Sequence, residues 1–348
     1  MPKNIVIFSD GTGQKGGSKK NTNVYKLFNM IEDRTDKQIA FYDPGVGTDW
    51  RLVTGNISGG GITQNIKQCY EFIFDNFKAG DQLYLFGFSR GAATVRSLSS
   101  LIHMFGILPF SRRDLINEAF DIYKMRNFDK REKTAEDFIS RHHTMWTNIK
   151  FLGVWDTVSA LGLPIESLDM VINKISLFRH RFHNFKLSKA VENACQALAI
   201  DDIRLTFHPK IWDREITEDQ NMKQVWFCGV HTDVGGGYEE QGLSDIPLMW
   251  MTEMAKQCGL LIYPKHNVKI NQDIESKMHD SASGFPGSIY RKKERSWDAK
   301  TKGKLIVHES VTERKLNRQN KPDPAYDPWV LKQEHDIEPW NRDFNEKD

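Results

Sequence analysis

The sequence predicts an α/β fold with a mostly parallel sheet, and three observations support this. Short apolar runs recur along the chain, segments with helical spacing separate them, and polar or glycine-rich turns follow the runs. Runs that are apolar throughout, without alternation, are typical of strands buried on both faces. Strands that alternate with helices indicate right-handed crossover units, so helices are expected on both faces of the sheet.

The strand and helix candidates follow in order along the chain. Strands are expected at residues 5–8, 82–86, 151–155 and 225–230, with a weaker candidate at 39–42. Apolar spacings of three and four predict helices over 62–77, 91–105, 188–199 and 243–258.

The composition is that of a globular protein. The 348 residues are 39% hydrophobic and 27% charged, which excludes collagen-like and wholly disordered classes. The chain has 48 Lys and Arg residues against 46 Asp and Glu, a balance that predicts no nucleic-acid partner. The four cysteines have no Cys-x-x-Cys spacing, so reduced thiols in a reducing compartment are expected.

One core with insertions is the expected domain organisation. The α/β core spans 1–265, with helical cap insertions near 106–148 and 160–188, and residues 266–348 form a C-terminal extension packed on it. In that extension, residues 304–307 are expected to form an edge strand and the end from 317 to wrap the surface or fray.

The location of the protein is expected to be cytoplasmic as synthesised. No apolar run approaches the ~20 residues of a membrane-spanning helix, and the N-terminus has no secretory signal pattern. Delivery elsewhere or peripheral membrane contact stays open.

The strongest chemical motif is Gly87-Phe88-Ser89-Arg90-Gly91, between a predicted strand and a predicted helix. In that context Gly-x-Ser-x-Gly predicts a nucleophile elbow and the α/β-hydrolase fold. The sharp turn needs small residues two positions before and after the serine. We expect Ser89 to be the nucleophile and the Arg90 amide to face the developing oxyanion. The alternative is a serine that caps the helix.

A serine nucleophile needs a base and an acid, which follow it in the order Ser, Asp or Glu, His in α/β hydrolases. Asp156 closes one predicted strand and is the expected acid, whereas His231 closes a later strand and is the expected base. The alternatives are a helix-capping aspartate and a buried core histidine.

Three other residues compete for these roles. Asp233 could orient His231 or cap the next turn, and it is kept as a possible supporting residue. His279 and His308 could be the base instead, although neither follows a strong predicted strand, so both rank lower.

The loop after the first strand is expected to complete the oxyanion hole. The amide of Gly11 or Thr12 would donate, and Asp10 is a possible supporting residue. The same stretch is similar to the Asp-x-Asp-Gly-Thr signature of haloacid dehalogenase phosphatases, but Phe8 stands at the position of their nucleophile. A phosphatase-type hydrolase is therefore only an alternative.

No metal or other cofactor is expected. Asp10, Asp156, Asp233 and His231 offer oxygen and nitrogen ligands, but none of the usual metal-binding spacings is present. The glycine-rich stretch 58–61 lacks the lysine of a phosphate-binding loop and predicts a tight turn.

A basic amphipathic helix is expected over 167–186. Its apolar stripe either packs on the core or forms a mobile lid over the Ser89 pocket that turns toward lipid, which predicts possible peripheral membrane contact.

Four ordered motifs resemble the catalytic domain of the type VI secretion lipase effectors of the first class and the uncharacterised α/β hydrolases grouped with it. The motifs are IFSDGTG at 7–13, LFGFSRGA at 85–92, GVWDTV at 153–158 and GVHTDVGGGY at 229–238. The resemblance covers about residues 4–258. It implies a serine hydrolase that cleaves carboxylic esters of phospholipids, with Ser89, Asp156 and His231 as its triad. The alternative is a non-catalytic membrane or partner-binding module on the same fold. Protein partners stay open.

Overall fold

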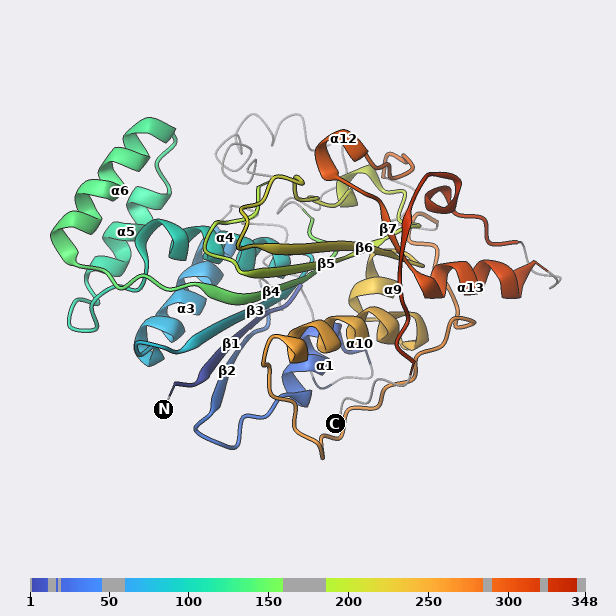
Figure 1. The fold of residues 1–348 in the computed structure, drawn as a ribbon, viewed down its shortest axis with the longest axis horizontal. Helices are drawn as coiled ribbons and strands as arrows, with labels where there is room; N and C mark the ends of the chain where they lie inside the picture. The colour runs from blue at the N-terminus through green and yellow to red at the C-terminus, as the bar shows by residue number, and fades with distance from the viewer. Residues whose placement is uncertain are drawn as a thin grey trace.

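The computed structural model describes residues 2–11, 17, 20–45, 60–158, 186–283, 290–319 and 325–342. Its centre is an eight-stranded sheet in the order β2-β1-β3-β4-β5-β6-β7-β8, in which neighbouring strands are parallel (Figure 1). The strands are β1 (Asn4–Ser9), β2 (Gln38–Asp43), β3 (Gln82–Phe88), β4 (Ile149–Trp155), β5 (Asn193–Ala199), β6 (Asn221–Phe227), β7 (Ile306–His308) and β8 (Asp336–Glu338). The predicted α/β class with a parallel sheet is confirmed.

Two hydrophobic cores, one on each face of the sheet, explain why the strands are apolar throughout. Ile5 and Ile7 of β1 pack with helices α3 (Gly60–Asn76) and α4 (Arg90–Phe105). Val6 and Phe8 point to the other face, where α1 (Asn23–Met30) and α10 (Gly242–Gln257) cover them. Because alternate side chains of a strand enter different cores, both sets must be apolar.

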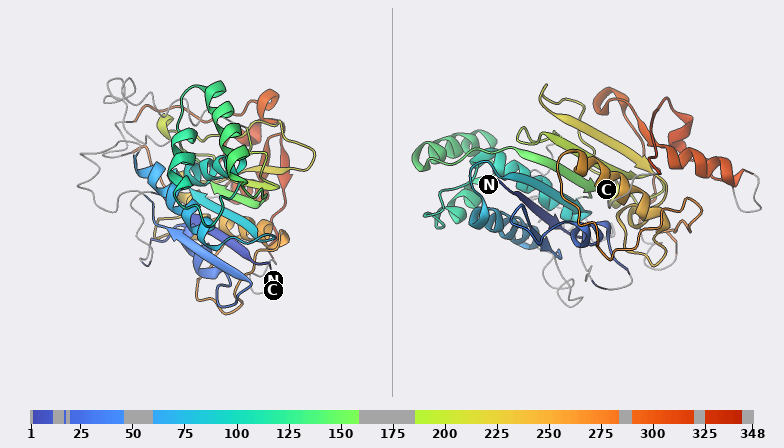
Figure 2. Two further views of the ribbon diagram at one scale, coloured as in Figure 1. Left: turned by 90° about the vertical axis from the view of Figure 1, so that its left-hand side faces the viewer. Right: turned by 60° about the horizontal axis from the view of Figure 1, so that its bottom comes forward.

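The C-terminal segment extends the same sheet. Strands β7 and β8 follow β6, and α13 (Glu309–Arg318) and η3 (Trp329–Lys332) pack with Trp226 in a third core. Figure 2 shows this segment, in orange and red, at the opposite end of the sheet from β2. The strand expected at 304–307 is β7, but it pairs on both sides, so β8 rather than β7 is the edge.

The prediction of a helix over 188–199 is wrong, because residues 193–199 form β5. Ala194, Cys195 and Leu198 have a spacing that also fits one face of a helix. This segment lies between β4 and β6 and is hydrogen-bonded to both, with burial on both faces. A short run buried on both faces satisfies either periodicity, so the neighbouring strands decide its structure.

The insertion at 106–148 is helical, as expected, but it does not cover Ser89. It forms α5 (Leu115–Tyr123) and α6 (Phe128–His142) between the end of α4 and the start of β4. Figure 1 shows both helices at the end of the sheet where the strands begin, and Ser89 follows the opposite end of β3. The expected insertion at 160–188 and the amphipathic helix at 167–186 lie almost wholly outside the described residues, as do residues 58–59 of the expected turn. Within the described ranges, none of the helices is long and apolar enough to cross a membrane.

Candidate active site

Ser89 occupies a strained turn between β3 and α4. Its backbone has φ 58° and ψ −120°, a region that residues with a Cβ atom rarely adopt. Its N–H donates to the carbonyl of Trp155 at 3.1 Å, which ties the turn to the end of β4. Ser89 stands at the N-cap position of α4, yet its side chain makes no capping hydrogen bond to the helix. This absence of a capping hydrogen bond argues against the helix-capping alternative.

The glycines flanking Ser89 are sterically required. A Cβ on Gly87 would lie 2.6 Å from the carbonyl oxygen of Gly91, and a Cβ on Gly91 would overlap the carbonyl group of Ser9. The elbow therefore packs directly against the end of β1. The connections from β1 and β3 leave in opposite directions along the sheet, which is the kind of position where α/β proteins bind ligands.

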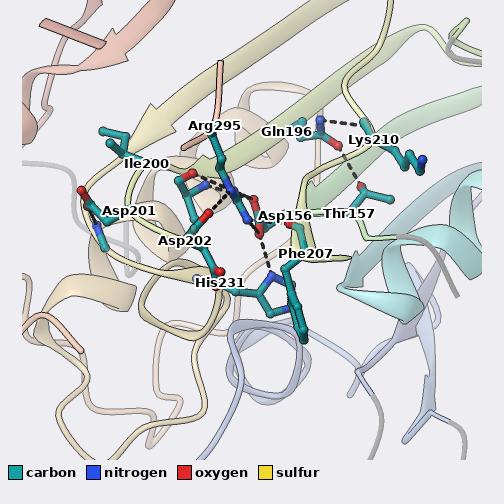
Figure 3. Close-up of polar contacts among 12 residues, drawn as sticks. Asp156, Thr157, Gln196, Ile200, Asp201, Asp202, Phe207, Lys210, His231 and Arg295 are labelled. Carbon is teal, nitrogen blue, oxygen red and sulfur yellow. Dashed lines mark hydrogen bonds and ion pairs between the residues drawn. The ribbon is translucent and has the colours of Figure 1, made fainter. Parts of the chain in front are cut away.

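Asp156 and His231 meet at this edge of the sheet. Asp156 follows β4 directly and His231 opens the short helix α9 (His231–Gly235). The Nδ1 atom of His231 lies 2.6 Å from Oδ2 of Asp156, and both side chains are buried (Figure 3). The predicted acid and base are thus brought together across 75 positions of the chain.

Aromatic contacts place the His231 ring beside the elbow. Its centroid is 4.6 Å from that of Phe88, the residue before Ser89, and 5.2 Å from that of Phe207. Gly235 makes room for this arrangement, because a Cβ there would overlap the Phe88 ring. Packing therefore brings the histidine, the aspartate and the serine turn to one end of the sheet.

Arg295 is the largest part of the site that sequence reasoning missed. Its Nη1 and Nη2 atoms donate to Oδ1 and Oδ2 of Asp156 at 2.7 and 3.0 Å, and the Ala199 N–H donates to Oδ1 at 3.0 Å. In Figure 3, Arg295 and His231 approach Asp156 from different sides. Arg295 lies in the charged stretch Arg291-Lys292-Lys293-Glu294-Arg295, which resembles an ordinary solvated surface and gave no signal.

The electrostatics of Asp156 follow from these contacts. Burial alone would raise the pKa of its carboxyl group, but the charge of Arg295 and the hydrogen bond with His231 outweigh burial and hold that pKa below its usual range. Asp156 is therefore ionised throughout the physiological pH range.

Asp202 and Arg204 form a second ion pair beside the site that the sequence did not reveal. The Arg204 guanidinium donates to both carboxylate oxygens of Asp202, and Asp202 also accepts from the His231 backbone N–H at 3.2 Å. Burial would raise the pKa of Asp202, but the hydrogen bond from Arg204 and the charges of Arg295 and Arg204 lower it. Arg204 also lies over the Phe207 ring at 3.6 Å from its centroid, so it holds that ring in place.

The two competing histidines occupy other environments. The Nδ1 of His279 lies 2.7 Å from Oδ1 of Asp233, and Asp233 accepts from the Val230 N–H at 3.1 Å. Asp233 therefore braces the start of α9 and holds His279, whereas His231 pairs with Asp156. His308 is buried at the N-cap of α13 with Nδ1 near Ser310, and burial lowers its pKa to about 3.

The oxyanion candidates differ in what the structure shows of them. The Arg90 amide is the first of α4, where a helix leaves N–H groups without helical partners. The Gly11 amide donates to Oδ1 of Asp10 at 2.7 Å, and Thr12 lies outside the described residues. Asp10 also accepts from Thr22 and Tyr42 at 2.5 and 2.7 Å, and burial raises its pKa to about 6. Asp10 thus braces the loop after β1.

No group of three potential metal ligands occurs among the residues that the structure describes.

A parallel sheet that carries a serine on a strained strand-to-helix turn defines an α/β hydrolase. The chain belongs to the family described as the type VI secretion system phospholipase effector Tle1-like catalytic domain, whose family model matches residues 3–254. The predicted resemblance and fold are confirmed.

The individual relatives have low sequence identity to this chain. The uncharacterized protein YEL023C of Saccharomyces cerevisiae is 28% identical over 214 residues, which cover 54% of this chain and 31% of that protein. An uncharacterized protein from Pseudomonas aeruginosa has a crystal structure similar at a TM-score of 0.51 and 18% identity, over 77% of this chain and 48% of that one. A structure of the Tle1 effector bound to the VgrG spike of the type 6 secretion system matches at 20% identity and a TM-score of 0.40, over 68% of this chain and 51% of that one. The chain thus spans about a third of the curated relative and about half of each solved chain.

Proposed function

We propose that this chain is a serine ester hydrolase whose triad is Ser89, Asp156 and His231. The observation that carries the proposal is the 2.6 Å contact between His231 Nδ1 and the buried Asp156 carboxylate, beside the strained turn of Ser89. Active-site residues are often held in unfavourable backbone conformations, and here the side chain that the turn presents is a hydroxyl. A buried acid, a histidine and a serine on a sharp turn are the parts that acyl transfer requires.

The geometry assigns a tautomer to His231. Because ionised Asp156 can only accept a hydrogen bond, Nδ1 carries the proton and Nε2 is left with its lone pair. Nε2 then takes the proton of Ser89 as Oγ attacks the ester carbonyl, and gives it to the leaving alcohol when the ester C–O bond breaks. In the second half, Nε2 takes a proton from water, which attacks the acyl-enzyme and releases the acid and free Ser89.

The oxyanion of each tetrahedral intermediate is held by amides. The Arg90 N–H at the start of α4 is the first donor, helped by the positive end of the helix. Gly11 and Thr12 are the candidates for the second. Gly11 can donate only if its amide leaves the Asp10 carboxylate, so Thr12 is the simpler assignment.

The substrate class comes from the family. Because the family is described as phospholipase effectors, we infer that the esters are carboxylic esters of phospholipids. The amphipathic segment expected at 167–186 would supply membrane contact. The phosphatase alternative is disfavoured because Phe8, at its nucleophile position, is fully buried and stacked on Phe86 at 5.2 Å.

A fluorophosphonate probe tests the proposal. The wild type should be labelled on Ser89, identified by peptide mass spectrometry, and Ser89→Ala should not be labelled. Ser97→Ala is the matched control, since Ser97 is a buried serine of the same helix, and it should label like the wild type. A folded wild type that is not labelled would favour the non-catalytic module.

A second assay tests the substrate class. Phosphatidylglycerol and phosphatidylcholine vesicles are incubated with wild type or Ser89→Ala, and released fatty acid is measured. Release by the wild type alone supports a phospholipase. Labelling by the probe without release from either vesicle would indicate another carboxylic ester.

A further inference from the structure

Arg295 lies behind the Asp156–His231 pair and is itself buried, with 2% of its surface exposed. It belongs to the C-terminal segment, after the residues matched by the family model, which end at 254. A buried arginine that bonds both oxygens of a proposed catalytic carboxylate calls for a functional explanation, because burying a charge is costly unless it is fully paired.

We propose that Arg295 is a positioning residue for the triad. It holds the Asp156 carboxylate in the orientation that His231 needs, and its charge compensates that of the buried carboxylate. This inference rests on the proposed function, and it makes the C-terminal segment part of the active site.

The carboxylate of Asp156 has no freedom to rotate. Its Oδ1 accepts from the Ala199 N–H and from Nη1 of Arg295, while Oδ2 accepts from Nη2 of Arg295 and from His231. The two parallel bonds from the guanidinium define the plane of the carboxylate. Oδ2 is thereby aimed at His231.

The guanidinium is fixed in turn. Its three remaining N–H groups donate to backbone carbonyls, from Nε to Asp202 at 3.0 Å, from Nη1 to Ala199 at 2.7 Å and from Nη2 to Phe207 at 2.7 Å. All five donors of the side chain are thus used. The carbonyls belong to the end of β5 and the segment after it, whose Phe207 ring packs on His231. Arg295 therefore holds both Asp156 and the segment whose Phe207 ring packs on His231.

The charges around His231 make the electrostatic role specific. Asp202 and Arg204 neutralise each other as a bidentate pair. Farther along the same two segments of the chain, Nε2 of His208 contacts the carbonyl of Lys293. The remaining charged pair is Asp156 with Arg295, and Asp156 also contacts the His231 ring.

Loss of the Arg295 charge has one expected direction. Without the facing guanidinium, the buried carboxyl group of Asp156 would protonate more readily. A protonated Asp156 inactivates the triad, so the acid limb of the pH profile moves to higher pH.

The experiment is the pH dependence of kcat/KM for a short, water-soluble ester. Arg295→Met should lower kcat/KM at pH 8 by about 10- to 100-fold, as expected for a misplaced catalytic group, and shift the acid limb upward by about one pH unit or more. Arg295→Lys keeps the charge but not the planar fork. It should keep the acid limb near that of the wild type while kcat/KM falls.

Arg314→Met is the matched control. Arg314 is a buried arginine of the same C-terminal segment that donates to the backbone carbonyls of Ile274 and Ser276. Its loss should lower the melting temperature without moving the acid limb. If Arg295→Met has the same acid limb as the wild type and resembles Arg314→Met, Arg295 only packs the fold.

A double variant keeps the test decisive if Arg295→Met does not fold. Arg295→Met with Asp156→Asn buries no unpaired charge, and because Arg295 acts through Asp156 it should be little less active than Asp156→Asn alone. A further loss of tenfold or more would overturn the proposal. Ser89→Ala separates this proposal from the proposed function. Retained activity in Ser89→Ala would refute the triad. An inactive Ser89→Ala together with an unshifted acid limb in Arg295→Met would refute only the role of Arg295.

Discussion

The molecule contains two aspartate–histidine pairs that look alike as hydrogen bonds but differ in their surroundings. His231 lies 2.6 Å from Asp156 and His279 lies 2.7 Å from Asp233. The Asp156 pair is backed by a buried arginine and faces the residue before the elbow serine. The Asp233 pair has no such backing among its described contacts.

The second pair is held by neighbours that suit a structural role. Asp233 accepts from the backbone N–H groups of Val230 and His279, and the His279 ring stacks on Tyr238 with centroids 3.7 Å apart. The other ring nitrogen of His279 lies 3.3 Å from the Glu240 carboxylate. The comparison teaches that a short aspartate–histidine contact alone does not identify a catalytic pair, because the partners of the second ring nitrogen and of the carboxylate decide what the pair can do.

The largest expected effect separates the two histidines. His231→Gln should lower kcat by about 10⁴- to 10⁶-fold, because the general base is lost. His279→Gln should stay within about tenfold of the wild type. Steady-state rates on a soluble ester, with melting temperatures to verify folding, measure both, and the opposite ranking would make His279 the base.

The two aspartates should differ nearly as much. Asp156→Asn should lower kcat by about 10⁴-fold, since an amide facing the Arg295 fork turns its NH2 group toward His231 and favours the wrong tautomer. Asp233→Asn should keep kcat within about tenfold but destabilise the fold by about 1–3 kcal/mol, because one N–H around it loses its acceptor. Kinetics and urea unfolding of the two variants test this, and a greater loss of kcat in Asp233→Asn would contradict it.

The pH dependence of stability should have opposite slopes for the two aspartates. The pKa of Asp156 is lowered in the fold, chiefly by Arg295 against the effect of burial, so its stabilisation is full above the unfolded pKa of about 3.9 and is lost as the pH falls through the folded value. Burial raises the pKa of Asp233, so its contribution is largest below about 3.9 and is lost as the pH rises through the folded value.

Unfolding in urea between pH 6 and pH 3 measures these slopes. The stability gap between wild type and Asp156→Asn should shrink as the pH falls, whereas the gap between wild type and Asp233→Asn should grow. Parallel slopes would mean that the two carboxylates have similar environments.

The smallest effect concerns the exposed end of the second pair. Glu240→Gln removes a solvent-exposed carboxylate beside His279, and exposed ion pairs contribute about 0–1 kcal/mol. Activity should stay within about twofold and the melting temperature within about 2 °C. A tenfold loss of activity would show that the second pair communicates with the reaction.

Much of the site was predictable because its motifs are local. The elbow at Ser89 depends on a buried strand, a helix and two glycines within five positions. The overlap at Gly87 is a consequence of that same stretch, whereas the overlap at Gly91 is with Ser9 at the end of β1. Asp156 could be predicted because it follows an apolar strand directly, and His231 because it closes the apolar run 225–230, which continues past the end of β6.

Other residues had no local signal. Arg295 is separated from Asp156 by 139 positions and lies in a run of charges, and Asp202 follows β5, which was predicted to be a helix. The triad itself stays a proposal, as do the roles of Thr12 and the segment 167–186.

The sequence by itself determined the parallel α/β class, the order of the motifs and the position of the serine turn, because hydrophobic runs and turn sterics act between residues close in the chain. Only the tertiary structure decided which histidine pairs with which aspartate, that residues 193–199 are a strand, and that a C-terminal arginine backs Asp156. These depend on strand order in the sheet, which brings groups 75 and 139 positions apart into hydrogen-bonding distance, and no local pattern encodes such separations.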